Sequence, residues 1–222
     1  MKIFDKALLG LGIFFAGSEL VKQILLTFIL GNGHYDWWYL PFQLCSLPIY
    51  LIPLAHFSKR SHIRQVILTF LATYNLLGGA AAFLDTSGMH YAMTILTVHS
   101  YVWHILLIFT GILAAACLFF QSKGKMSWKT FIQATALFLM ACLMASVLNL
   151  VISPIGSIDM FYINPLLPME QIVFRDIGRQ LGNTAAIILY MGTIIAFSGL
   201  LFFIWQQAFK VIRRRGLFRY SI

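Results

Sequence analysis

Charged side chains are scarce in this sequence. Asp, Glu, Lys and Arg make up 10% of the 222 residues, against about 25% in a soluble domain. Acidic residues are the rarest, with 7 Asp and Glu against 16 Lys and Arg. Hydrophobic residues reach 60%, whereas soluble domains contain roughly 45–50%. This composition excludes a soluble globular domain and a disordered chain, and it predicts an integral membrane protein.

Cysteine is also rare, and none of the three cysteines lies in a CxxC pair. Cys45, Cys117 and Cys142 all fall inside hydrophobic runs. This spacing excludes a disulfide scaffold and supports neither a zinc site nor a redox motif. We therefore expect no metal and no cofactor. The default role of each cysteine is that of a small buried apolar residue.

The hydrophobic residues form six long runs. Because about 20 apolar residues cross a bilayer core, we predict an all-α bundle of six transmembrane helices forming a single transmembrane domain over residues 1–222. The runs cover residues 7–30, 39–56, 65–84, 92–120, 130–152 and 184–209. Pro48 and Pro53 predict a kink in the second helix. Residues 153–182 are expected to be a partly ordered outer segment.

Part of that outer segment has helical periodicity. From Met169 to Gly182, apolar residues recur at helical spacing, and Arg175 and Arg179 share another face. This pattern predicts an amphipathic helix on the outer membrane surface or over the end of the bundle. The alternative is an ordinary loop.

The basic residues predict the orientation. With six helices, 13 of the 16 Lys and Arg fall on one side, together with both termini. By the positive-inside rule that side is the cytoplasm, and we expect a multipass protein of a bacterial cytoplasmic membrane. The net charge of +9 then needs no nucleic acid as partner. The 13 residues are Lys2, Lys6, Lys59, Arg60, Arg64, Lys123, Lys125, Lys129, Lys210, Arg213, Arg214, Arg215 and Arg219.

A few polar side chains lie at membrane depth, where they are costly and often functional. Counting 1.5 Å per residue along each helix places six of them in one layer of the outer half. Glu19 is three residues before Lys22, so the two can pair. The pair either fixes the first helix against the bundle or holds a substrate head group. The six residues of the layer are Lys22, Gln43, Cys45, His99, Ser100 and Asn149.

Cys45 and His99 are the two members of this layer that offer reaction chemistry. A thiol becomes a strong nucleophile when a neighbouring imidazole removes its proton. Gln43, Ser100 or Asn149 would then orient the imidazole or donate hydrogen bonds to an oxyanion. The alternative is a buried cysteine and a histidine bonded to a neighbouring helix.

The same residues carry a resemblance to a known family. The segment Tyr39–Pro48 (YLPFQLCSLP) resembles the signature of the YwaF-like multipass membrane proteins, whose eukaryotic relative is transmembrane protein 164. The similarity extends from about Asp36 to Pro165, through Leu76–Ala80 (LLGGA), Thr97–Ser100 (TVHS), Asn149, Ile155–Tyr162 (IGSIDMFY) and Asn164-Pro165. Gln43 stands where the family usually has His, and Ser100 where it has Gly.

The resemblance implies an acyltransferase that moves acyl chains between phospholipids and uses a Cys and a His, here Cys45 and His99. The expected partners are then membrane lipids, with a phospholipid or another amphipathic molecule as substrate. The other hypothesis is a transporter or receptor without enzymatic activity, which would bind a small solute or lipid in the same outer polar layer. In that case Glu19, Lys22 and Asn149 would matter more than Cys45. The oligomeric state stays open.

Overall fold

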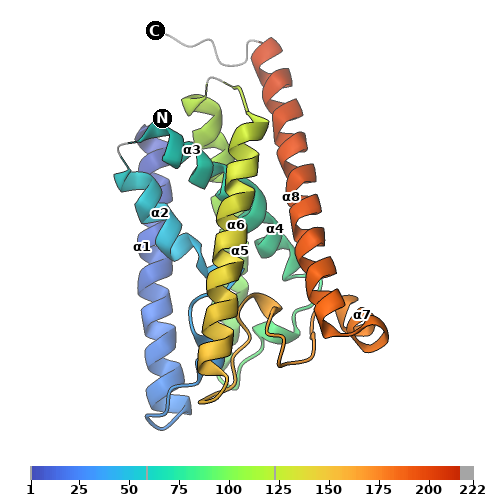
Figure 1. Cartoon of the computed structure of the whole chain (residues 1–222). Helices are drawn as coiled ribbons and strands as arrows, with labels where there is room; N and C mark the ends of the chain where they lie inside the picture. Colours follow the sequence, from blue (N-terminus) through green and yellow to red (C-terminus); the bar gives the residue numbers. More distant parts are fainter. Residues whose placement is uncertain (1, 59, 123, 216–222) are drawn as a thin grey trace.

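The protein is a bundle of helices. The computed structural model describes residues 2–58, 60–122 and 124–215, and within these ranges it contains no strand. The long helices run side by side, and the connections gather at the two ends (Figure 1). The all-α prediction is therefore confirmed.

Four helices are long and apolar enough to cross a membrane. They are α1 (Lys2–Ile24), which continues as a π-helix over Leu25–Leu30, α5 (Thr94–Gln121), α6 (Trp128–Ile152) and α8 (Asn183–Arg214). The 25 residues of α6 alone measure about 38 Å, which exceeds a hydrocarbon core of about 30 Å. These helices are compatible with an integral membrane protein.

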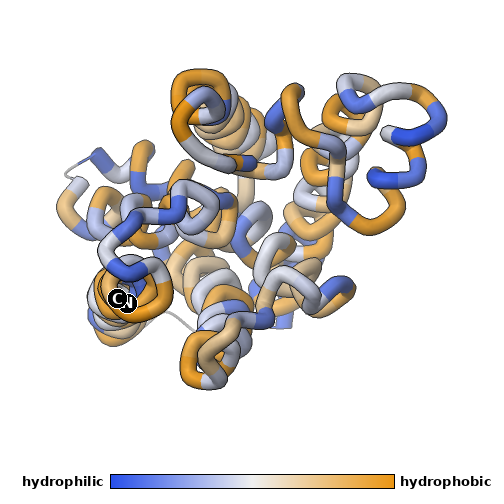
Figure 2. Tube along the Cα trace, turned by 90° about the horizontal axis from the view of Figure 1, so that it is seen from below, coloured by the Kyte–Doolittle hydropathy of each residue, from blue (hydrophilic) through white to orange (hydrophobic). Residues whose placement is uncertain are grey.

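Apolar side chains cover the outside of these helices. Figure 2, which looks along the bundle, shows hydrophobic residues around much of its circumference. Ile13, Ile105, Leu143 and Phe203 are each about half exposed or more. In water such a surface would be a liability, whereas in a bilayer it contacts lipid chains.

The second predicted helix is broken in its first half. Over residues 39–56 we expected one kinked helix, but two 3₁₀ turns, Trp37–Tyr39 and Leu44–Ser46, precede a short α2 (Pro48–Phe57). The ten residues of α2 measure only about 15 Å. Pro41 and Pro48 lack an amide donor and disfavour helical geometry in the preceding residue, so the stretch between them stays irregular.

The third predicted helix is continuous but contains an irregular turn. It consists of α3 (Ser61–Phe70), a π-helical turn over Leu71–Asn75 and α4 (Leu76–Ala81). Within it, α4 packs closely on α5. A Cβ on Gly79 would lie 2.9 Å from Leu107 Cβ, and one on Gly111 would lie 2.6 Å from Leu76 Cβ. The tight packing expected from the glycines of this region is therefore present.

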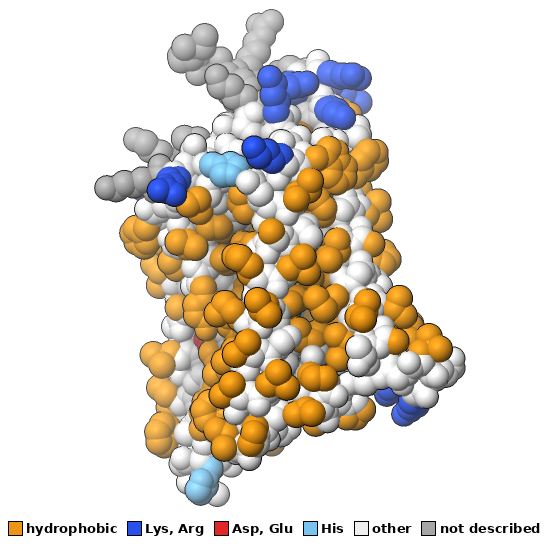
Figure 3. All heavy atoms as spheres, in the orientation of Figure 1, with side chains coloured by type: hydrophobic (Ala, Val, Ile, Leu, Met, Phe, Trp, Pro, Cys, Tyr) orange, Lys and Arg blue, Asp and Glu red, His pale blue; other side chains and the backbone are white. Residues whose placement is uncertain are grey.

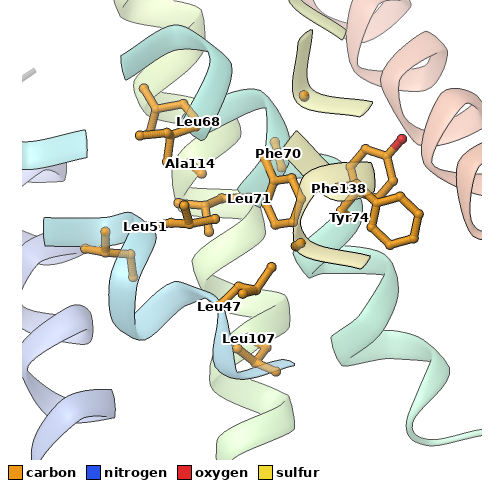
Figure 4. Packing of buried hydrophobic residues seen from close by; sticks show 14 of the residues in the cluster. Leu47, Leu51, Leu68, Phe70, Leu71, Tyr74, Leu107, Ala114 and Phe138 are labelled. Atoms are coloured by element: carbon orange, nitrogen blue, oxygen red, sulfur yellow. The ribbon is translucent and has the colours of Figure 1, made fainter. Parts of the chain in front are cut away.

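Aromatic rings fill the centre of the bundle (Figure 4). Tyr74, from the π-helical turn, stacks on Phe70 and Phe138 with ring centroids 5.2 and 4.9 Å apart. Its hydroxyl lies 2.7 Å from Thr135 Oγ1, so its polar end is satisfied inside an apolar core. Such close packing matters because lipid supplies little hydrophobic force between helices.

The two ends of the bundle differ in charge. Lys and Arg gather at the end where α1 begins and α8 ends, which we call the basic end (Figure 3). A smaller basic group, Arg175 and Arg179, lies on α7 (Phe174–Leu181) at the opposite, distal end. Of the 13 residues used to predict orientation, Lys59, Lys123, Arg219 and the side chain of Lys2 lie outside the described residues.

The predicted outer segment is largely ordered. Ile158, Met160, Phe161 and Ile163 are buried, and a 3₁₀ turn covers Met160–Tyr162. The expected helix over residues 169–182 begins only at Phe174, after a non-helical Val173 with φ of 72°. A helical segment is thus present, but it is shorter than predicted.

Candidate functional site

Two amides clamp the distal segment onto the bundle. Gln43 Oε1 accepts a hydrogen bond from the Phe161 amide (2.6 Å), and Gln43 Nε2 donates to the Asp159 carbonyl (2.7 Å). Asn149 Oδ1 accepts from the Met160 amide (2.7 Å), and Asn149 Nδ2 donates to the Met160 carbonyl (3.1 Å). Gln43 and Asn149 therefore position three consecutive residues, and each side-chain amide both donates and accepts one hydrogen bond in this arrangement.

The clamped segment has an unusual backbone. Phe161 and Tyr162 have φ of 61° and 57°, a conformation that is uncommon for bulky residues. Asp159 closes the turn, because its Oδ1 accepts from the Asn164 amide at 2.8 Å. Only 3% of Asp159 is exposed, and this burial raises the pKa of its carboxyl group to about 7.

A buried charged group lies on α1 at membrane depth. Glu19 is 5% exposed, and its Oε1 lies 2.9 Å from Lys22 Nζ. Gln23 Nε2 donates to the same oxygen at 2.7 Å and also to the Tyr39 carbonyl at 2.7 Å. The ion pair predicted from the spacing is thus confirmed, and Gln23 ties it to the irregular chain before α2.

Trp103 connects Cys45 with His99. Its Nε1 donates to the Cys45 carbonyl at 3.2 Å, and its ring centroid lies 5.4 Å from that of His99. Within the described residues, no hydrogen bond joins the Cys45 thiol to the His99 imidazole.

His99 retains a free hydrogen-bonding position. Its Nε2 is buried and has no partner in the described parts of the chain. His104, by contrast, is held within its own helix, because its Nδ1 lies 2.8 Å from the Ser100 carbonyl. Ser100 itself is 6% exposed. A buried nitrogen without a partner is costly, which makes His99 Nε2 a position where a ligand or a proton would be accepted.

Two partly buried tyrosines, Tyr91 and Tyr162, lie in the connecting segments at the distal end. The Tyr91 ring packs on Tyr39 with centroids 5.6 Å apart. Burial raises the pKa of Tyr91, and it raises that of Tyr162 to about 12. Both phenols therefore remain protonated at neutral pH and can donate hydrogen bonds.

Sequence reasoning did not single out Trp103, Gln23, Tyr91 or Tyr162. For two of them a signal was available. Trp103 is four residues after His99, and Gln23 is four after Glu19, so each shares a helix face with a residue already selected. The tyrosines lie in connecting segments, where no periodicity marks them.

The described residues contain no group of three or more His, Cys, Asp or Glu side chains arranged to hold a metal ion. Comparison of the chain with protein-family models, with curated proteins and with solved structures found no match. The chemistry of the site must therefore be inferred from its side chains.

Proposed function

We propose that this protein is a membrane-embedded acyltransferase, or a related lipid-modifying enzyme, that uses Cys45 as nucleophile and His99 as base on phospholipid acyl chains. The observation that carries the proposal is the unpartnered His99 Nε2 in the same layer as the half-buried Cys45, with Trp103 contacting both residues.

The reaction would proceed in two steps, acylation of Cys45 and transfer of the acyl chain to the acceptor. His99 removes the proton of the Cys45 thiol, and the thiolate sulfur attacks the carbonyl carbon of a phospholipid ester. The ester C–O bond breaks, the lysophospholipid oxygen takes the proton from His99, and the acyl chain remains on Cys45 as a thioester. A hydroxyl of a second lysophospholipid then attacks the thioester while His99 takes its proton, and the restored thiolate is reprotonated.

The neighbouring groups have supporting roles in this scheme. The phenols of Tyr91 and Tyr162 are candidate donors to the oxyanion of the tetrahedral intermediate. Ser100 would help to orient its neighbour His99. Gln43 and Asn149 would act as positioning residues, because their amides hold the turn that carries Tyr162. The Lys22 ammonium would attract the phosphate of the head group, with Glu19 holding it in place.

The proposal includes a topology of six membrane-crossing segments with both termini in the cytoplasm, in a bacterial cytoplasmic membrane. Its support is the position of the Lys and Arg side chains at the end where α1 begins and α8 ends (Figure 3). The broken second segment would then place irregular backbone at membrane depth, which is tolerated where it is buried in protein or lines a polar site. The acyl donor would enter from the outer leaflet.

The test is acyl exchange by the purified protein in vesicles that contain one phospholipid with a labelled acyl chain and one unlabelled lysophospholipid. Cys45→Ala and His99→Gln should each abolish transfer, and a hydroxylamine-sensitive acyl group should be found on Cys45 by mass spectrometry. Cys142→Ala is the matched control, because Cys142 is buried in α6 away from this layer. Full transfer by the Cys45 variant would refute the nucleophile assignment.

A second candidate function is binding without catalysis, as in a transporter or receptor for a small solute or lipid. The observation that favours it is the buried Glu19–Lys22 pair, since ionisable side chains at membrane depth often mark ligand pathways. Thiol labelling separates the two functions. An activated Cys45 would react with iodoacetamide much faster than Cys142 near neutral pH, whereas a cysteine that only lines a binding site would not.

A further inference from the structure

A recess lies at the basic end, between α3, α5, α6 and α8. Its walls include Gln65, Ser122, Lys125, Ser127, Thr130 and Phe202, and it encloses about 260 Å³ of space, its mouth included. No acidic side chain lines it. The nearby Asp5 is already bound to Arg64. The recess therefore presents hydrogen-bond donors without a carboxylate to neutralise them.

Several of these donors have no partner. Thr130 is 9% exposed, lines the recess, and its hydroxyl makes no hydrogen bond within the described ranges. The same holds for the side-chain amide of Gln65. Lys125 is exposed and forms no ion pair with any described residue. The Thr130 side chain is thus largely buried, and its unpartnered hydroxyl is available to a ligand in the recess.

The first turn of α6 adds a positive potential. Ser127 caps this helix by accepting from the Lys129 amide at 3.2 Å. The amide of Trp128, the first residue of α6, has no partner in the described part of the chain. Helix N-termini attract anions through such free amides and the helix dipole. Ser127 and Thr130 of this terminus line the recess together with Lys125, whereas Trp128 does not.

We infer that this recess binds a phosphate group, carried either by a phospholipid head group or by a soluble phosphate compound. Phosphate offers several acceptor oxygens and negative charge, which match the Thr130 hydroxyl, the Gln65 amide, the first turn of α6 and the Lys125 ammonium. The buried Phe202 ring forms an apolar wall. The recess lies at the end opposite to the Cys45 layer, so it is independent of the proposed enzymatic function.

Binding is tested on the full chain in phosphatidylcholine nanodiscs, with inorganic phosphate titrated against thermal unfolding, and in nanodiscs that also contain phosphatidic acid, with bound lipid counted by native mass spectrometry. Lys125→Gln and Thr130→Val should each weaken binding roughly tenfold, since a charge-assisted or buried hydrogen bond is lost. Lys129→Gln is the matched control, because it removes the same charge four residues further along the chain, from a residue that does not line the recess.

Each outcome decides the question. An effect of inorganic phosphate identifies a soluble phosphate compound as ligand, and retention of phosphatidic acid alone identifies a lipid head group. Equal losses in the Lys125 and Lys129 variants would show diffuse surface attraction and overturn the proposal, as would the absence of binding by either probe. If Thr130→Val does not fold, the comparison of Lys125→Gln with Lys129→Gln still tests the proposal, because both residues are exposed.

Discussion

The hydrogen bonding of polar side chains differs between the two ends of the bundle. At the distal end, the amides of Gln43 and Asn149 bond to main-chain groups, and Glu19 bonds to Lys22 and Gln23. At the basic end, Lys125 and Thr130 line a recess without partners in the described part of the chain. The polar groups of the distal end are thus mostly bonded within the chain, with His99 Nε2 and Gln23 Oε1 as exceptions, whereas the recess of the basic end would be completed by the proposed phosphate ligand.

The largest expected difference in stability is between two ion pairs, one at each end of the bundle. Glu19→Ala leaves the Lys22 ammonium at membrane depth, and we expect a loss of about 3–5 kcal/mol in the free energy of unfolding. Asp5→Ala breaks the pair with Arg64 at the basic end, where Arg64 keeps Gln121 Oε1 as a partner at 3.2 Å. That loss should be about 1–2 kcal/mol. Both are measured by denaturant unfolding in bicelles. Equal losses would mean that Lys22 reaches water when Glu19 is removed.

A smaller effect is expected from pH at the distal end. Because the folded pKa of Asp159 is raised to about 7 from an unfolded value near 3.9, the neutral carboxyl is the form favoured by the fold. Its contribution to stability is complete below about pH 4 and is lost as the pH rises through about 7. The protection factors of the amides of residues 158–164, which correct exchange for its intrinsic acceleration with pH, should therefore fall between pH 5 and pH 8.

Asp159→Asn is the variant that isolates this group, because an amide oxygen can still accept from the Asn164 amide. It should remove the pH dependence of the protection factors in the turn. Asp176→Asn, on the exposed surface of α7, is the control and should leave the dependence unchanged. If the pH dependence persists in Asp159→Asn, another titrating group must cause it.

A further test concerns a single amide on α6. Asn149→Ala removes both bonds to Met160 and leaves its buried N–H without a partner, while its C=O still accepts from the Ile163 amide; the expected cost is about 1–3 kcal/mol. Gln133→Ala is the matched control, because Gln133 lies on the same helix and its buried Oε1 already lacks a partner among the described residues. Its loss should be under about 1 kcal/mol, as read from the same unfolding assay. Comparable losses would contradict the clamp assigned to Asn149.

The long helices were predictable because their signal is local. Runs of about 20 apolar residues are needed for a membrane span, and α5, α6 and α8 begin and end within a few residues of the expected bounds. The Glu19–Lys22 pair was predictable for the same reason, since a spacing of three fixes a shared helix face. Local periodicity carries no comparable information about the irregular chain before α2.

The partners of the candidate site residues depend on long-range contacts. Gln43 bonds to the main chain of Asp159 and Phe161, more than a hundred positions away, and main-chain groups leave no trace in a sequence pattern. Counting residues along each helix predicted that Cys45 and His99 lie at similar depth. It could not predict that Trp103 contacts both residues, because these contacts depend on how α5 packs against the broken segment before α2.

The π-helical turn at Leu71–Asn75 sets the rotational phase between the two halves of its helix. A π turn holds an extra residue compared with an α turn, so the faces of α3 and α4 are out of register with each other. This offset lets α3 contact α6 while α4 presents Gly79 to α5. Deleting one residue from the turn would restore a regular helix and rotate α4 by about 100°, turning Gly79 away from α5 and a bulkier side chain toward it.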